Sequence, residues 1–161
     1  MAFLAHPAQA QKTEQEANLK AVFIYNFTKY IEWTNNDNDD EFRIGVLGQS
    51  EVTNSLLEIA RANRAKNKRI VIKQFRRPED IDHCDILFIA QNPGFPLESI
   101  MERVDKGTLT VSEVPGYAKL GTAFNFVVVN DKLKFEANRK ALYAAGLRAG
   151  SQLMKLAIIV D

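Results

Sequence analysis

Short apolar runs alternate with amphipathic segments through the middle of the chain, and this alternation limits the possible folds more than any other feature. Apolar runs rich in β-branched residues cover 42–48, 69–75 and 84–90, and apolar residues at helical spacing cover 51–62 and 96–107. Such runs are typical of strands covered on both faces, and their alternation with helices favours a parallel sheet.

A hairpin is predicted after these elements. Runs 123–129 and 132–136 flank Asn130-Asp131, a two-residue turn signal, and a further strand is predicted at 108–113. We therefore predict one α/β domain over residues 13–161. It is a three-layer sandwich with a mostly parallel sheet, an antiparallel edge hairpin and helices on both faces.

A helix is predicted before the first strand. Thr13 and Glu16 have the spacing of a capping box, and apolar residues then recur at helical spacing until Trp33 ends the helix. We expect this helix to be structural, with Asn26 buried and hydrogen-bonded. The alternative is that Asn26, Lys29 and Trp33 form a patch that faces a partner.

The first ten residues resemble the end of an export signal. Ala8-Gln9-Ala10 follows a short apolar piece and has the small-x-small pattern that signal peptidase reads. We predict that residues 1–10 are the remnant of this signal, with cleavage before Gln11, and that the mature protein is periplasmic. Cys84 is the only cysteine, so an internal disulfide is impossible and the cysteine count does not decide the compartment.

The composition argues for a binding module rather than an enzyme. Two histidines and one cysteine supply few nucleophiles, soft metal ligands or bases that titrate near neutral pH. A net charge of +1 gives no overall field toward nucleic acid, and no stretch approaches the roughly 20 apolar residues of a membrane span. We predict no enzymatic activity, no cofactor and no metal. A catalytic pair of carboxylates stays open, because such pairs cannot be recognised without the fold.

Polar loops follow two of the predicted strands. Gly48, Gln49 and Ser50 follow the first strand, and Gln91 and Asn92 follow the third. In parallel α/β sheets such loops border a crevice at the carboxyl ends of the strands, where ligands bind. The glycines lack the G-x-G-x-x-G spacing, so turn formation is the favoured role and a nucleotide-like ligand is the alternative.

A structural role is the favoured explanation for each of two charged segments and for the cysteine. Segment 35–41 begins like a calcium loop, but Asp40 stands where glycine is required and Val46 where glutamate is required. Cys84 is expected to be a small core residue. An anionic partner is the alternative to simple solvation for the cationic segment, defined as Arg61, Arg64, Lys66, Lys68, Arg69, Lys73, Arg76 and Arg77.

The order of motifs resembles that of the YfiR-like family. The chain carries LKAVFIYNFTKYIEW, then FRIGVLG, CDILFIA and TLTVSE, and finally LKFEANRKALYAAGLRAGSQLMKLA. The resemblance implies an exported α/β protein that docks on the periplasmic domain of an inner-membrane signalling protein such as a diguanylate cyclase. Docking would repress the cyclase and lower cyclic di-GMP signalling and biofilm formation. The redox control that disulfides give the family does not transfer, because Cys84 has no partner.

The final segment is the predicted interaction surface. Arginine beside aliphatic surface suits interfaces, and here two arginines could frame an apolar face with Leu142 and Leu153. The alternative is that these leucines belong to the core. The partner-binding candidates are Arg139, Arg148, Leu147, Trp33 and Lys29. Apolar runs at 124–129 and 156–160, together with the resemblance, favour a homodimer.

Two functional hypotheses remain. The first is an exported regulatory protein that docks on a membrane protein, and its rival is a periplasmic small-ligand receptor or enzyme that uses the crevice. Identification of a membrane-protein partner would support the first, and a tight metabolite without any such partner would support the second.

Overall fold

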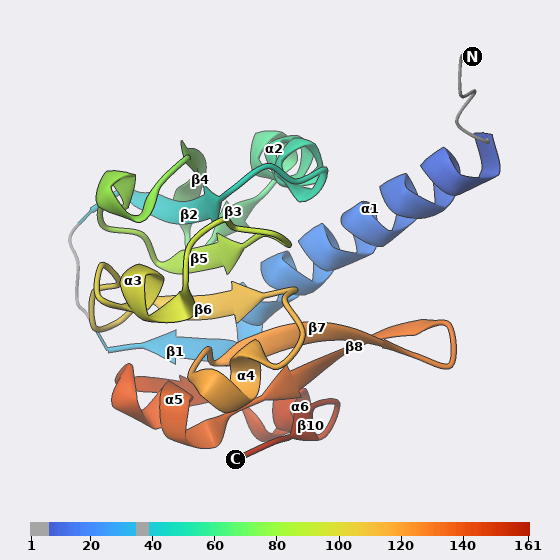
Figure 1. The fold of residues 1–161 in the computed structure, drawn as a ribbon. Coiled ribbons are helices and arrows are strands. Elements are labelled where there is room, and N and C mark those ends of the chain that lie inside the picture. Colours follow the sequence, from blue (N-terminus) through green and yellow to red (C-terminus); the bar gives the residue numbers. More distant parts are fainter. Residues whose placement is uncertain (1–6, 35–38) are drawn as a thin grey trace.

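A mixed sheet of eight strands lies at the centre of the residues that the computed structural model describes, 7–34 and 39–161 (Figure 1). Its strands are β2 (Glu41–Leu47), β3 (Arg64–Ala65), β4 (Lys68–Phe75), β5 (Ile86–Ile89), β6 (Leu109–Ser112), β7 (Phe124–Val129), β8 (Lys132–Ala137) and β10 (Ile158–Ile159). Their spatial order is β10-β8-β7-β6-β5-β2-β4-β3. The five neighbouring strands β7, β6, β5, β2 and β4 all run parallel to one another. The predicted class and the mostly parallel sheet are confirmed.

Helices cover both faces of this sheet, as predicted. The larger core lies between the sheet and α1 (Pro7–Tyr30), α2 (Val52–Ala62), α5 (Arg139–Ala144) and α6 (Ser151–Met154). The smaller core lies under the other face, with α3 (Leu97–Met101), α4 (Tyr117–Leu120) and Ile81, which follows the 3-10 helix η1 (Pro78–Asp80). Figure 1 shows α3 and α4 in front of the sheet and the first half of α1 projecting beyond it.

Phenylalanines join α1 to the hairpin of β7 and β8. The ring of Phe27 lies 4.7 Å from that of Phe124 and 5.1 Å from that of Phe135, between ring centroids. One turn earlier, Phe23 meets Phe126 at 5.9 Å. Aromatic pairs at these separations add to the stability that burial of their area provides. This cluster fixes α1 across the sheet.

The turn between β7 and β8 has the predicted form. Asn130 and Asp131 have φ values of 51° and 62°, as a two-residue turn with both central residues in the left-handed region requires. Asn and Asp tolerate this region better than most residues, so the missing glycine does not prevent the turn. β8 then runs antiparallel to β7 from Lys132 onward.

The ends of α1 differ from the prediction. The helix begins at Pro7 rather than Thr13 and ends at Tyr30, so Ala8 and Ala10 lie in its first turns. Proline at a helix start and the Ala- and Gln-rich residues after it favour this earlier beginning. Trp33 lies outside the helix, in strand β1 (Ile31–Trp33).

Several short elements escaped prediction. β1 pairs antiparallel with β9 (Leu147–Ala149) to form a separate two-stranded sheet, and β3 and β10 add short strands at the two edges of the main sheet. The helix predicted at 96–107 ends at Met101. The prediction for Asn26 is wrong: it is half-buried and makes no side-chain hydrogen bond with another residue that the structure describes.

Candidate functional site

The two-stranded sheet of β1 and β9 brings together three of the predicted partner-binding residues. Trp33 lies opposite Leu147, and Arg148 lies opposite Glu32. Arg148 is exposed, whereas Leu147 is only 4% exposed and belongs to the larger core, together with Leu142 and Leu153. The apolar side chains predicted to form the interaction surface therefore anchor this segment on the core, and its charged side chain faces solvent.

Trp33 is held firmly in this sheet. Its indole Nε1 donates a hydrogen bond to the backbone oxygen of Asp85 at 3.1 Å, and its ring meets Phe42 edge to face at 5.1 Å. The ammonium of Lys66 lies 6.0 Å from the centre of the indole ring. Trp33 is half-buried, so only part of its ring could contact a partner.

Lys29 and Arg139 lie at separate places. Lys29 is exposed in the last turn of α1, and its ammonium lies 4.8 Å from the centre of the Tyr25 ring. Arg139 is exposed at the start of α5, and both its backbone N–H and its side-chain Nε reach Asp161, at 3.1 and 3.4 Å. Lys29 lies two residues before the start of β1, so it belongs with Trp33 and Arg148 rather than with Arg139.

The two polar loops predicted to border a crevice lie at the switch point of the sheet. The chain passes from β2 outward to β4 and then returns to β5 on the other side of β2, so the loops after β2 and β5 diverge. Gly48, Gln49 and Ser50 lie in the first of these loops, and Gln91 and Asn92 lie in the second. Ligands bind at such points in open α/β sheets.

Internal hydrogen bonds already use much of the backbone of these two loops and one of their side chains. Gly48 donates from its N–H to the oxygen of Phe75 at 3.0 Å and accepts from Gln74 Nε2 at 2.6 Å. The hydroxyl of Ser50 accepts from the N–H of Val52 at 3.1 Å. Gln49, Gln91 and Asn92 are exposed. These bonds build the turns and leave mainly the exposed amides for a ligand.

The glycines of β2 and the following loop have structural roles. A Cβ on Gly45 would lie 2.6 Å from Cε2 of Phe75, so only glycine fits between β2 and this ring. Gly48 has a φ of 93°, in the left-handed region where a side chain is strained. Close packing and a tight turn therefore account for both positions.

A buried ion pair lies at the carboxyl end of the sheet, and the sequence did not point to it. The ammonium of Lys20, from α1, contacts Oε2 of Glu113 at 2.7 Å, and the two side chains are 12% and 11% exposed. Oε1 of Glu113 accepts a hydrogen bond from the N–H of Gln91 at 2.8 Å. Glu113 follows directly after β6, and this position at a strand end was the available signal. The pair ties α1 to the loop after β5.

The pKa of Lys20 reflects two opposing effects. Burial favours the neutral amine and lowers the pKa, but the hydrogen bonds and charges of Glu113, and then of Glu16, outweigh burial. The pKa of Lys20 is therefore raised above its usual value. Lys20 stays charged at neutral pH and, through Glu113, holds the loop after β5.

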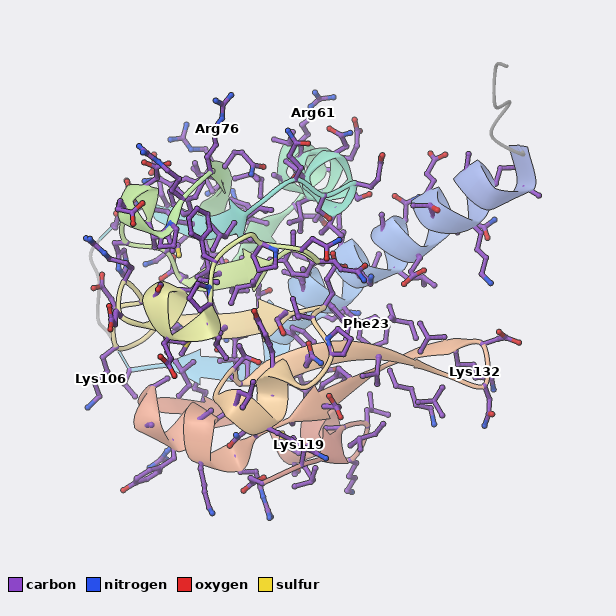
Figure 2. All side chains as sticks on the ribbon, in the orientation of Figure 1. Phe23, Arg61, Arg76, Lys106, Lys119 and Lys132 are labelled. Carbon is purple, nitrogen blue, oxygen red and sulfur yellow. The ribbon has the colours of Figure 1, made fainter. Side chains whose placement is uncertain are left out.

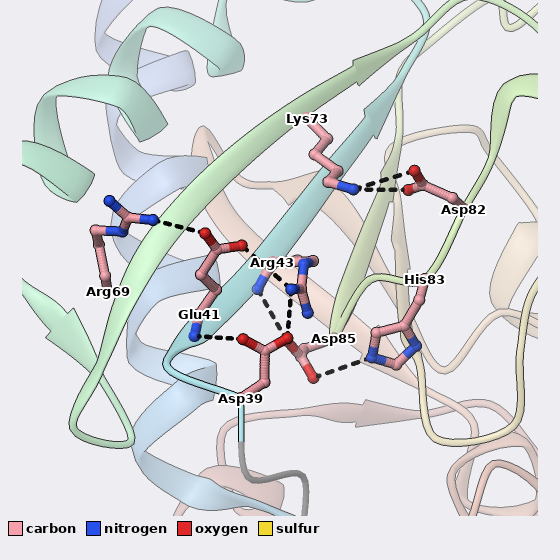
Figure 3. A network of polar contacts seen from close by, with 8 residues as sticks. All are labelled: Asp39, Glu41, Arg43, Arg69, Lys73, Asp82, His83 and Asp85. Atoms are coloured by element: carbon pink, nitrogen blue, oxygen red, sulfur yellow. Dashed lines mark hydrogen bonds and ion pairs between the residues drawn. The ribbon is translucent and has the colours of Figure 1, made fainter.

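A polar network of different character lies at the amino ends of the strands (Figure 3). Arg43 pairs with Asp39 and with Glu41, the latter at 3.2 Å, and its backbone N–H donates to Asp85 at 2.8 Å. The hydrogen bond from the Arg43 guanidinium lowers the pKa of Asp39. His83 lies 3.9 Å from Asp85. These contacts fasten the start of β2 to the loop before β5.

Cys84 and the acidic segment do not form a reactive or metal site among the described residues. Cys84 is buried, and burial raises the pKa of its thiol to about 12, so the thiolate is scarce at neutral pH. Residues 35–38 of the acidic segment lie outside the described residues. Within 7–34 and 39–161, no group of three or more His, Cys, Asp or Glu side chains could hold a metal ion.

Much of the cationic segment is engaged in ion pairs. The pairs are Arg61 with Glu58, Arg69 with Glu41, Lys73 with Asp82 and Arg77 with Asp80. Arg64 differs from these residues, because its guanidinium donates to the backbone oxygen of Asn67 at 3.4 Å and contacts no described carboxylate. The segment surrounds β4 and the end of α2 at one edge of the sheet.

The comparison with protein families is decisive for the class of protein. The model of the YfiR/HmsC-like family matches residues 17–158, from the middle of α1 to β10. The chain belongs to this family. YfiR/HmsC-like proteins are periplasmic regulators rather than catalysts, and membership implies partnership with a membrane signalling protein.

Other comparisons bear on the fold alone. The structure is similar to the crystal structure of a conserved domain protein from Vibrio cholerae O1 biovar El Tor, with a TM-score of 0.56 and 10% identity. The match covers 90% of this chain and 60% of the Vibrio chain, so this chain spans less than two thirds of that protein. No curated protein sequence matches the chain.

Among the described residues, no helix has both the length and the apolar character needed to cross a membrane.

Proposed function

We propose that this YfiR/HmsC-like protein is a periplasmic repressor that docks on the periplasmic domain of an inner-membrane diguanylate cyclase or related sensor. Docking lowers cyclic di-GMP signalling. The family match over residues 17–158 carries this proposal, because it includes α1, β1 and β9 as well as the sheet. Export rests on the pattern Ala8-Gln9-Ala10.

The β1–β9 sheet and the start of α5 are the proposed docking surface. Arg148 is exposed on the first of these, Lys29 is exposed at the end of α1 just before it, and Arg139 is exposed on the second. The leucines near these arginines, Leu142 and Leu147, are buried, whereas the arginines are exposed. The charge of each arginine can therefore be reversed without disturbing the core. Rim charges of this kind steer association and set partner choice.

The test measures binding and repression together. Deletion of the gene should raise cellular cyclic di-GMP, and the purified protein should bind the isolated periplasmic domain of the responsible cyclase. Arg139→Glu/Arg148→Glu should weaken both effects. Arg103→Glu/Lys119→Glu makes the same charge change at exposed positions beside α3 and in α4, outside the proposed surfaces, and is the matched control. Unchanged cyclic di-GMP after deletion would reject the repressor role.

We also propose that the protein forms a homodimer. Val128 and Val129 at the hairpin tip, and Leu156, Ile158 and Ile159 near β10, leave apolar side chains exposed. Light scattering should give twice the chain mass at micromolar concentration. A chain mass that persists at higher concentration would reject the dimer.

A small-ligand receptor is the second candidate, favoured by the position of the crevice at the switch point. Gln49 and Gln91 would supply the exposed amides. A panel of nucleotides tested by thermal denaturation separates the two functions. A saturable rise in melting temperature that Gln49→Ala/Gln91→Ala abolishes would support the receptor.

A further inference from the structure

The outer edge of β4 lacks a strand partner over most of its length. β3 pairs only with Lys68 and Arg69, whereas β2 pairs with β4 from Arg69 to Phe75 on the inner side. Among the described residues, no strand pairs with the outer side of β4 from Ile70 onward. A free edge of this length can accept a strand from another protein.

The direction of the backbone groups along this edge follows from two hydrogen bonds. The N–H of Arg69 donates to Asp40, and the oxygen of Phe75 accepts from Gly48, so both residues turn their backbone toward the β2 side. Alternate residues of a strand turn their backbone groups to opposite sides. Ile70 and Ile72 therefore direct their N–H and C=O groups outward, where an added strand would bond.

A groove of about 630 Å³ runs beside this edge, between β4 and the end of α2. We call it the edge groove, lined by Leu57, Ala60, Arg61, Ala62, Asn63, Arg64, Arg69, Ile70 and Ile72. Leu57 is a large apolar side chain that is 41% exposed there, and Ile72 is half-buried. The groove thus offers an apolar floor for alternate side chains of an extended segment.

The charges of the edge groove indicate which charges an extended segment bound there must carry. Its lining contains three arginines and no acid. Arg64 has no described carboxylate partner, and the pair of Arg61 with Glu58 is highly exposed, so a new carboxylate can compete for either guanidinium. Figure 2 shows Arg61 and Arg76 extending into solvent from this end of the molecule.

We propose that the edge groove and the outer edge of β4 bind an extended acidic segment of a partner protein as an additional strand. Its backbone bonds to Ile70 and Ile72, its apolar side chains lie on Leu57, and its carboxylates meet Arg61 and Arg64. A second copy of this chain is a poor occupant, because arginines would face arginines across the pairing. The proposal goes beyond the repressor role and stands whether or not the partner is a cyclase.

The probe is a short capped peptide of alternating valine and glutamate, with a valine–lysine peptide of equal length as its control. The glutamate peptide should bind at low salt about tenfold or more tightly than the lysine peptide, and weaken as salt is added. Hydrogen exchange should show new protection of the amides of Ile70 and Ile72. Equal binding of both peptides, no binding at all, or protection confined to other strands would overturn the proposal.

Two variants locate the site. Arg61→Glu/Arg64→Glu should reduce affinity for the glutamate peptide about tenfold, since each lost charge contact carries part of the binding. Lys132→Glu/Lys134→Glu should not change it. Ile72→Pro removes one outward donor, which an edge strand tolerates, and should remove binding while circular dichroism stays unchanged. If Ile72→Pro unfolds, the arginine variant still decides, and full affinity in that variant rejects the site.

Discussion

Two regions of the molecule hold similar chemical groups in different surroundings. At the carboxyl end of the parallel strands, Lys20 and Glu113 meet at 2.7 Å with about a tenth of each side chain exposed. Between β4 and the loop before β5, Lys73 and Asp82 meet at 3.0 Å, but 31% and 61% of their side chains are exposed (Figure 3). Because water screens the second pair, nearly equal distances imply unequal energies. Exclusion of solvent decides which pair supports the fold.

The largest effect is expected from breaking the buried pair. Glu113→Leu removes the closer of the two carboxylates that contact the Lys20 ammonium, leaving Glu16 at 3.1 Å, and removes the acceptor of the Gln91 N–H. The free energy of unfolding should fall by about 3 kcal/mol, at the low end for buried pairs that lose one partner, because Glu16 still compensates part of the charge. Urea denaturation measures this change.

The double variant Lys20→Met/Glu113→Leu is the control for that loss. It removes both charges, so much of the stability should return. A single Glu113→Leu variant that loses less than about 1 kcal/mol would show that the pair is effectively solvated. The contrast between the two ion pairs would then disappear.

A buried hydrogen-bond network at the carboxyl end of β6 should give the next largest effect. Asn125 accepts a hydrogen bond from the Ser112 hydroxyl at 2.5 Å and donates to Glu136 at 3.1 Å, and both Asn125 and Ser112 are fully buried. Asn125→Leu leaves the hydroxyl unpaired and should cost about 1–3 kcal/mol. Adding Ser112→Ala should recover part of that loss in the same urea assay. No recovery would point to misfit of the leucine instead.

Sequence periodicity predicted the sheet because its signal is local. The runs 42–48, 69–75 and 84–90 gave β2, β4 and β5, and Asn130-Asp131 gave the hairpin turn. β1 and β9 were missed because each has three residues and is stabilised by pairing with the other from a distant part of the chain. Short strands of this kind have no local period to read.

The site was predicted only in part, for a related reason. The loops after β2 and β5 could be placed at the carboxyl ends of neighbouring parallel strands from the order of elements. Lys20 and Glu113 lie 93 positions apart, and only the packing of α1 on the sheet brings them together. Leu147 was expected at an interface, but pairing with β1 buries it. Contacts between distant segments were the information that the sequence lacked.

Titration sharpens the comparison further. The raised pKa of Lys20 means that its stabilising contribution is fully present below its usual pKa of 10.5 and is lost as pH rises through the folded-state value. The difference in stability between the native protein and Lys20→Met/Glu113→Leu should therefore be constant from pH 7 to about 10 and shift against the native protein above 10.5. Urea midpoints of both proteins across this range measure it. A difference that shifts below pH 9 instead would assign the effect to another group.

The smallest effect is expected at the exposed pair of Lys73 and Asp82. Asp82→Asn removes the carboxylate that Lys73 contacts at 3.0 and 3.1 Å but leaves a side chain of the same shape. Both groups reach water, so Lys73 can be solvated after the change and no buried charge is left behind. The free energy of unfolding should change by no more than about 0.5 kcal/mol in urea denaturation. Added salt should shrink even this difference, because exposed pairs are screened. A loss above about 1 kcal/mol that persists in high salt would mean that Lys73 and Asp82 act as a buried pair, and solvent exposure would no longer explain why the two ion pairs differ.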